Sequence, residues 1–213
     1  MPGGKRWHRL LVVLLVFAVA ACTDRERPGT LRIGLAEEPR TLNVWLASDA
    51  NSRKVLSLIY QPLYQNDPET LDLVPWLAAS LPVYDPERRS YTIALRDARW
   101  SDGTPFTSRD VAFTGELIQS FKVPRYRSKW KFVDRVETPD DRTVVFYLKK
   151  PMATFLSGTL ATPIVQEKRW AAIAEKAETT SKPLTTLLNH RVHRPVGTGP
   201  FILEQWRRGA FLH

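Results

Sequence analysis

The chain has 213 residues, of which 43% are apolar and 25% charged, so it is long enough and apolar enough to fold around a core of its own. A single cysteine excludes an intramolecular disulfide framework and a zinc site built from cysteines. The net charge of +9 does not indicate nucleic-acid binding, because three cations precede an apolar N-terminal run and the others are spread along the chain, as on a solvated surface.

Residues 1–21 have the parts of a secretory signal peptide. Lys5, Arg6 and Arg9 form a basic start, and an apolar stretch runs from Leu10 to Ala21. A helix of this stretch spans about 18 Å, short of the roughly 30 Å hydrocarbon core of a bilayer, which disfavours a permanent transmembrane helix. The segment is therefore predicted to direct export to the periplasm or the cell surface.

Cys22 follows the run Val19-Ala20-Ala21, and these four residues resemble a bacterial lipobox. The resemblance implies that the thiol is diacylglycerylated and that the peptide is cut before it, which gives a membrane-anchored lipoprotein. The alternative is an ordinary signal peptide with an incidental cysteine. Residues 22–29 are polar and end in Pro28-Gly29, as expected of a tether.

The mature chain is predicted to open with a strand, a loop and a helix. Leu31–Leu35 alternates apolar with other residues, and Glu37–Arg40 breaks that pattern. Ser52–Tyr60 has its apolar residues on one helical face. The pair Val83-Tyr84 and Tyr91–Leu95 brackets a turn that contains proline, which predicts a β-hairpin.

A capped helix follows the hairpin. Thr107 stands three residues before Asp110, a variant of the capping box. The remaining elements are expected as a hairpin of Phe132–Val136 and Thr143–Leu148, helices at Met152–Leu160 and Glu167–Lys176, a loop with room for one short helix at 179–194, and a strand at Phe201–Leu203. This mixture of helices and strands predicts an α/β (mixed α+β) fold.

Two motifs carry a resemblance to a known family. The first runs from Tyr91 to Phe113 and contains Asp102-Gly103-Thr104-Pro105-Phe106-Thr107 and Asp110-Val111-Ala112-Phe113. The second is Arg194-Pro195-Val196-Gly197-Thr198-Gly199-Pro200-Phe201. Over most of residues 30–210 the chain is similar to the family 5 solute-binding proteins of ATP-binding-cassette (ABC) importers. These are the dipeptide, oligopeptide and nickel-type periplasmic receptors.

The resemblance implies the first lobe of a type II periplasmic-binding-protein-like fold. Residues 30–58 and 191–213 are then expected in the main sheet of this lobe, and residues 59–190 in its extra subdomain. Family members are considerably longer and have a second lobe, which this chain lacks. The sequence therefore looks like an N-terminal fragment or a truncated gene product.

The same resemblance places the ligand cleft at the loop after the first strand and at the glycine turn. Glu37 or Glu38 can meet a ligand amine and Arg40 a carboxylate; the alternative is that these are ordinary solvated loop charges. The predicted ligand-binding residues are Glu37, Glu38, Arg40, Leu42, Asn43, Tyr60, Leu63, Gly197, Thr198 and Gly199.

The predicted function is that of a lipid-anchored receptor, which binds a peptide or other small solute and delivers it to the transmembrane subunits of an ABC permease. The alternative is a single-lobe lipoprotein that acts as a binding or structural module without transport. No Gly-x-Ser-x-Gly motif occurs, and Gly197-Thr198-Gly199 is not a nucleotide loop because Pro200 follows it. We therefore expect no catalytic residues, cofactor, metal site or nucleic-acid partner.

Overall fold

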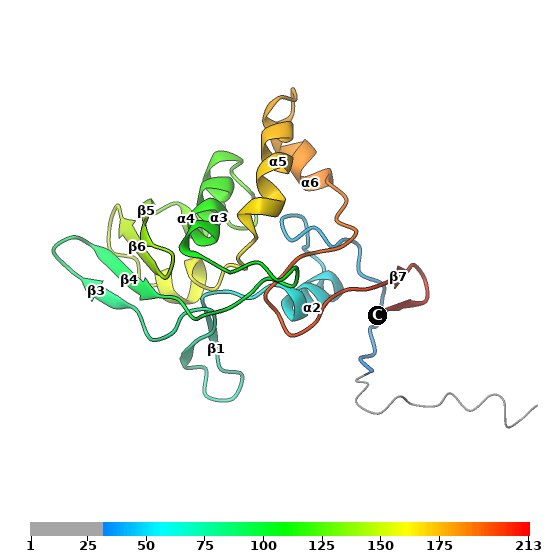
Figure 1. Cartoon of the computed structure of the whole chain (residues 1–213), viewed down its shortest axis with the longest axis horizontal. Helices are drawn as coiled ribbons and strands as arrows, with labels where there is room; N and C mark the ends of the chain where they lie inside the picture. Colours follow the sequence, from blue (N-terminus) through cyan, green and yellow to red (C-terminus); the bar gives the residue numbers. More distant parts are fainter. Residues whose placement is uncertain (1–31) are drawn as a thin grey trace, which may run out of the picture. The chain divides into compact units, whose positions relative to one another are not determined.

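The computed structural model describes residues 32–213, so the predicted signal peptide, Cys22 and the tether at 22–29 lie outside the described residues. The chain divides into two units, one ending at Leu35 and one comprising Ala36–His213. Residues 32–35, the described part of the predicted first strand, form no strand. All of the helices and strands below belong to the second unit (Figure 1).

Helix α2 (Ala50–Ile59) forms as the sequence predicts. The carboxylate of Asp49 caps its N-terminus and accepts a hydrogen bond from the N–H of Ser52 at 2.8 Å. Leu56 and Ile59 turn its apolar face into the core. The helix ends where Tyr60 becomes extended.

A four-stranded antiparallel sheet is built from strands between residues 83 and 148. Its strands are β3 (Val83–Asp85), β4 (Ser90–Ala94), β5 (Val133–Asp140) and β6 (Thr143–Leu148), in the order β3-β4-β6-β5. Both predicted hairpins are confirmed. Along β6 the residues Val144, Phe146 and Leu148 are buried while those between them are half-buried, so one face of the sheet covers the core.

Two further hairpins are too short for an alternating pattern to predict. They are β1 (Tyr64–Asn66) with β2 (Leu73–Pro75), and β7 (Trp206–Arg207) with β8 (Phe211–Leu212). The prediction of a strand at Phe201–Leu203 is wrong, because these residues form no strand. The N–H of Phe201 donates instead to the carbonyl of Leu58, at the end of α2, so this segment has no neighbouring strand to pair with.

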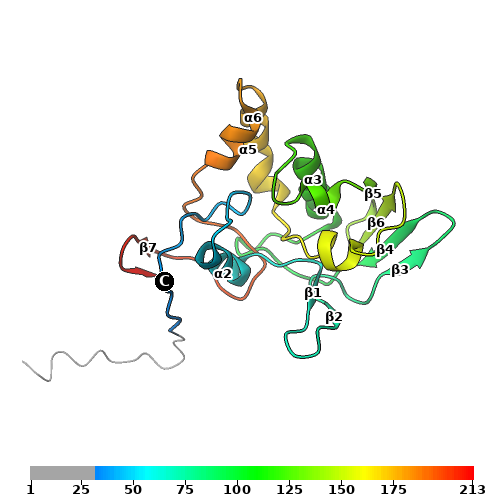
Figure 2. The same cartoon turned by 180° about the vertical axis from the view of Figure 1, so that it is seen from behind.

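The helices of the second half cover the sheet and extend beyond it (Figures 1 and 2). Helix α3 contacts β5, α4 and α5, and α5 lies beside α6. The predicted helix at Met152–Leu160 is reduced to a five-residue π-helix. The bounds are α3 Ser108–Ser120, α4 Arg127–Trp130, η1 Phe155–Thr159, α5 Glu167–Glu178 and α6 Pro183–Asn189.

Aromatic rings fill the core between α3, α4 and the sheet. Trp130 packs against Phe146, with ring centroids 6.0 Å apart, and Phe146 packs against Phe155 at 5.5 Å. A Cβ at Gly115 would lie 2.4 Å from the Trp130 ring, so α3 needs a glycine where this ring lies across it. The short helix α4 is therefore fixed by its one buried residue, Trp130.

Candidate functional site

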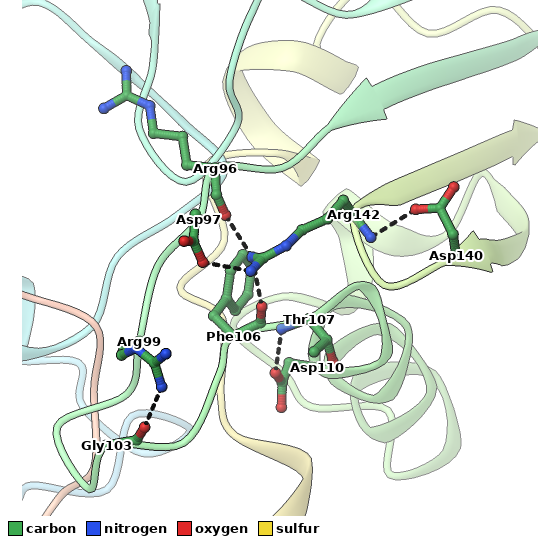
Figure 3. Close-up of polar contacts among 9 residues, drawn as sticks. All are labelled: Arg96, Asp97, Arg99, Gly103, Phe106, Thr107, Asp110, Asp140 and Arg142. Atoms are coloured by element: carbon green, nitrogen blue, oxygen red, sulfur yellow. Dashed lines mark hydrogen bonds and ion pairs between the residues drawn. The ribbon is translucent and has the colours of Figure 1, made fainter.

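The first motif is held in place by the guanidinium group of Arg142 (Figure 3). This group donates to the carbonyl oxygens of Arg96 at 2.9 Å and Phe106 at 3.1 Å, and it pairs with the carboxylate of Asp97. The backbone N–H of Arg142 donates to Asp140 at 2.7 Å, and this bond lowers the pKa of Asp140. The turn between β5 and β6 thereby fixes the loop that connects β4 to α3.

Asp110 is a buried carboxylate at the start of α3. One of its oxygens accepts hydrogen bonds from the backbone N–H of Thr107 at 2.9 Å and from the indole of Trp100 at 3.1 Å. The other accepts from the backbone N–H of Glu167 at 2.9 Å. Burial raises the pKa of Asp110, while these hydrogen bonds act in the opposite direction. Both oxygens are therefore engaged in joining the capping box to the start of α5.

The second motif approaches the backbone of α2 very closely. A Cβ at Gly197 would lie 1.9 Å from the carbonyl oxygen of Ile59, and a Cβ at Gly199 would lie 2.3 Å from that of Leu58. The N–H of Gly199 donates to Ile59 at 2.8 Å. These glycines are required because no side chain fits between the turn and the helix end.

The two motifs meet although almost one hundred residues separate them in the sequence. The backbone N–H of Ser101 donates to the carbonyl of Gly197 at 2.8 Å, and the Ser101 hydroxyl lies 3.4 Å from the Gly197 nitrogen. The first motif, the second motif and the end of α2 are thus in direct contact with one another. The sequence order alone gives no sign of this contact.

An amide and an indole border the glycine turn, and sequence reasoning missed both. With the Gln61 amide oriented to satisfy its neighbours, its oxygen accepts from the indole of Trp76 at 2.6 Å and its nitrogen donates to the carbonyl of Thr198 at 2.8 Å. The Trp76 side chain is exposed. Neither residue belongs to a motif or an apolar period, so no pattern in the sequence marked them.

The predicted loop charges differ in their surroundings. The Glu38 carboxylate accepts from the indole of Trp206 at 3.0 Å and lies 4.0 Å from Arg208, so it holds the loop to the β7–β8 hairpin. Glu37 and Arg40 are exposed, and neither forms an ion pair with another described residue. Arg40 does act on the nearby carboxylate of Asp49. Burial opposes ionisation of this group, yet its pKa is lowered, mainly by hydrogen bonds from Ser52 and also by the Arg40 charge.

The other four predicted residues, Leu42, Asn43, Tyr60 and Leu63, are buried to 3% exposure or less. The Asn43 amide nitrogen lies within 3.1 Å of the carbonyl oxygens of Leu187, Leu188 and His190, and its oxygen accepts from the N–H of Trp45 at 2.9 Å. This side chain fastens the loop to the end of α6. The structure thus places these four in the core, as supports of the loop and not as part of its surface.

Within residues 32–213, no three His, Cys, Asp or Glu side chains gather as metal ligands. No helix in the same part of the chain is long and apolar enough to cross a bilayer.

Comparison with known proteins gives a family match for residues 72–212, to the family described as bacterial extracellular solute-binding proteins, family 5 Middle. Protein XP55 of Streptomyces lividans is 35% identical over 183 residues, which is 84% of this chain and 30% of that protein. A putative ABC transporter peptide-binding protein of Brucella ovis is 32% identical over 148 residues, 69% of this chain and 27% of that protein. The chain thus spans about a third of the length of these relatives.

A solved structure has the same fold. It is the periplasmic binding protein AgaA from A. tumefaciens R10 in complex with agropinic acid, with a TM-score of 0.69 and 29% sequence identity. The match covers 83% of this chain and 33% of that one. The mixed α/β fold of this chain is therefore part of a periplasmic-binding-protein fold, as the sequence predicts.

Proposed function

The chain belongs to the bacterial extracellular solute-binding proteins of family 5, and on that basis we propose that it forms part of the receptor of an ABC importer. The receptor captures a peptide or peptide-like solute outside the cytoplasm and delivers it to a membrane permease, without making or breaking a bond. The observation that carries this proposal is the family match over residues 72–212, because it spans both motifs.

The solute-facing surface is formed by the exposed groups around the loop at 37–40 and the turn at 197–199. The turn offers backbone groups, and Trp76 offers an exposed ring beside it. Arg40 supplies a cation for a carboxylate, and Glu37 supplies an anion for an amine. A peptide requires these features: polar backbone partners, one or two charges for its ends, and apolar surface for its side chains.

A binding experiment with end-blocked peptides tests both charges on the native polypeptide. Arg40→Gln is expected to weaken binding of a peptide with a free carboxylate about tenfold, and to leave binding of its amidated form unchanged. Glu37→Gln is expected to weaken binding of a peptide with a free amine about tenfold, and to leave binding of its acetylated form unchanged. Lys54→Gln and Glu69→Gln, exposed charges outside this surface, serve as matched controls. The peptide proposal fails if calorimetry detects no peptide binding at all.

The single-lobe alternative is separated by the mass of the polypeptide in cells. An antibody raised against residues 30–200 is used to probe membrane fractions on an immunoblot. A band well above the 24.4 kDa of this chain supports the importer receptor. A band at 24 kDa or slightly below supports the module without a transport role.

We also propose that Cys22 carries the lipid anchor and that residues 1–21 are its signal peptide, with the tether at 22–29. The support is the run Val19-Ala20-Ala21-Cys22 behind an apolar segment. Cys22→Ser is expected to release the protein from membranes into the soluble extracytoplasmic fraction. Unchanged membrane association of this variant would contradict the anchor.

A further inference from the structure

A groove between α3, α4 and the ends of β5 and β6 collects cations that are far apart in the sequence. It is an open cavity of about 630 Å³. The elements that form it lie side by side in Figures 1 and 2. Its lining includes the basic residues Lys122, Arg127, Lys131 and Lys149, and we call it the basic groove.

The charge of the basic groove is not neutralised by the surrounding described residues. None of its four cations forms an ion pair within residues 32–213. The one carboxylate in the lining is Asp134, which lies 3.6 Å from Arg135, a guanidinium that Glu137 also binds at 2.8 Å. Four cations of the lining thus face a single carboxylate. The groove therefore keeps a positive potential toward solvent.

The walls of the groove are rigid. The Gln119 amide donates to the carbonyl oxygens of Trp130 at 3.3 Å and Val133 at 3.1 Å, which ties α3 to α4 and β5. Trp130 is buried, so the neighbouring residues of α4 project outward. Arg127 lies on α4 itself, Lys122 and Lys131 lie in turns directly next to the elements that these hydrogen bonds connect, and Lys149 lies in a bend directly after β6.

Lys122 occupies a backbone conformation that glycine prefers. It follows the end of α3 with a φ of 52°, in the left-handed region. A lysine at this position costs conformational energy that a glycine would avoid. It does, however, add a charge to the groove.

Basic residues and an aromatic ring extend the charged surface beyond the groove itself. Phe132 is half-buried, and the ammonium groups of Lys131 and Lys150 lie 5.5 Å and 4.4 Å from the centre of its ring. Residues 122–131 and 149–150 together contain seven Lys and Arg and no acid. An aromatic ring flanked by lysines is typical of proteins that rest on a lipid surface.

We propose that the basic groove binds the phosphodiester groups of anionic phospholipids and docks this face of the protein on a membrane surface. Flexible lysines are suited to phosphate, which they meet as point charges. A surface of many headgroups fits the spread of cations beyond the groove better than one small solute. Each lysine near such a surface strengthens binding about fivefold. This proposal does not depend on the solute that the protein carries.

The test compares two triple variants of residues 22–213, both in a Cys22→Ser background, so that neither an acyl chain nor the basic and apolar residues 1–21 contribute. Binding is measured to vesicles of phosphatidylglycerol and phosphatidylcholine, and to vesicles of phosphatidylcholine alone, at 0.1 M NaCl. The groove variant is Lys122→Gln, Lys131→Gln and Lys149→Gln. The matched control is Lys54→Gln, Lys168→Gln and Lys182→Gln, which removes the same charge from exposed lysines elsewhere.

The unmodified chain and the control are expected to prefer the anionic vesicles at least tenfold. The groove variant is expected to lose at least tenfold of its binding to anionic vesicles, and up to about a hundredfold if the three lysines act independently. An equal loss in both variants would overturn the proposal, because net charge alone would then explain the binding.

Further outcomes identify a different ligand. Groove-dependent binding of glycerophosphoglycerol in solution, without binding to vesicles, would replace the membrane with a soluble phosphodiester. Groove-dependent binding of polyglutamate without binding to vesicles would replace it with an acidic protein. If the groove variant does not fold, the salt dependence of the chain with an intact groove is measured instead. Its binding to anionic vesicles is expected to weaken between 0.05 M and 0.5 M NaCl, and unchanged binding contradicts the proposal.

Discussion

Adding a single methyl group at Gly197 is expected to disrupt the contact between the second motif and α2. The new Cβ would lie 1.9 Å from the oxygen, 2.6 Å from the carbon and 2.8 Å from the Cγ2 of Ile59. Two of these atoms belong to the backbone, so no side-chain rotation relieves the overlap. The turn and the helix end must therefore separate by about 1 Å, since Cβ contacts below 3.0 Å are essentially never observed.

This separation breaks the bonds from Gly199 to Ile59 and from Phe201 to Leu58, at about 1 kcal/mol each. The overlap itself adds about 1–3 kcal/mol, so we expect Gly197→Ala to lower the free energy of unfolding by about 3–5 kcal/mol. This free energy is measured by urea unfolding, with tryptophan fluorescence as the signal. Gly158→Ala is the control, because its Cβ would meet nothing closer than 3.9 Å and should change stability by less than about 1 kcal/mol. A loss below 1 kcal/mol for Gly197→Ala would refute the close approach.

Two other buried groups give predictions. In Asp110→Asn, one of the three N–H groups that donate to this carboxylate faces the NH2 group of the new amide. We expect the free energy of unfolding to fall by about 1–3 kcal/mol. Because the pKa of Asp110 is raised in the folded state, that state takes up a proton before the unfolded chain as the pH falls. The stability difference between the unmodified chain and this variant should therefore grow from pH 7 to pH 4, and a constant difference in urea titrations would contradict the raised pKa. Asn43→Asp places a carboxylate against three carbonyl oxygens. We expect the free energy of unfolding to fall by at least about 2 kcal/mol, and hydrogen exchange in residues 183–190 to become faster. Unchanged exchange there would show that Asn43 does not hold α6.

Local patterns in the sequence predicted the elements whose causes are themselves local. The two central hairpins follow from alternation on both sides of a turn, and α3 follows from the pair Thr107 and Asp110. The failures have non-local causes. Phe201–Leu203 has strand-like composition, but the N–H of Phe201 is taken by the end of α2.

The candidate site was less predictable than the fold for the same reason. Asn43 looks like a loop residue in the sequence, and only the fold brings it to the end of α6. The cations of the basic groove look scattered in the sequence, because Lys122 and Lys149 are 27 positions apart and meet only when α3 and β6 pack together. Glu37 and Arg40 are exposed, as expected for charges on a loop. The exposure of a loop is easier to infer from sequence than its contacts.

Both motifs make contacts that hold the scaffold together. Asp110 joins two helices, Gly197 and Gly199 allow the turn to touch α2, and Ser101 joins one motif to the other. Trp76, which is exposed beside the glycine turn, and Arg40, which is exposed on its loop, take no part in these contacts. Exposed residues of this chain can therefore be exchanged without breaking the contacts that the motifs make.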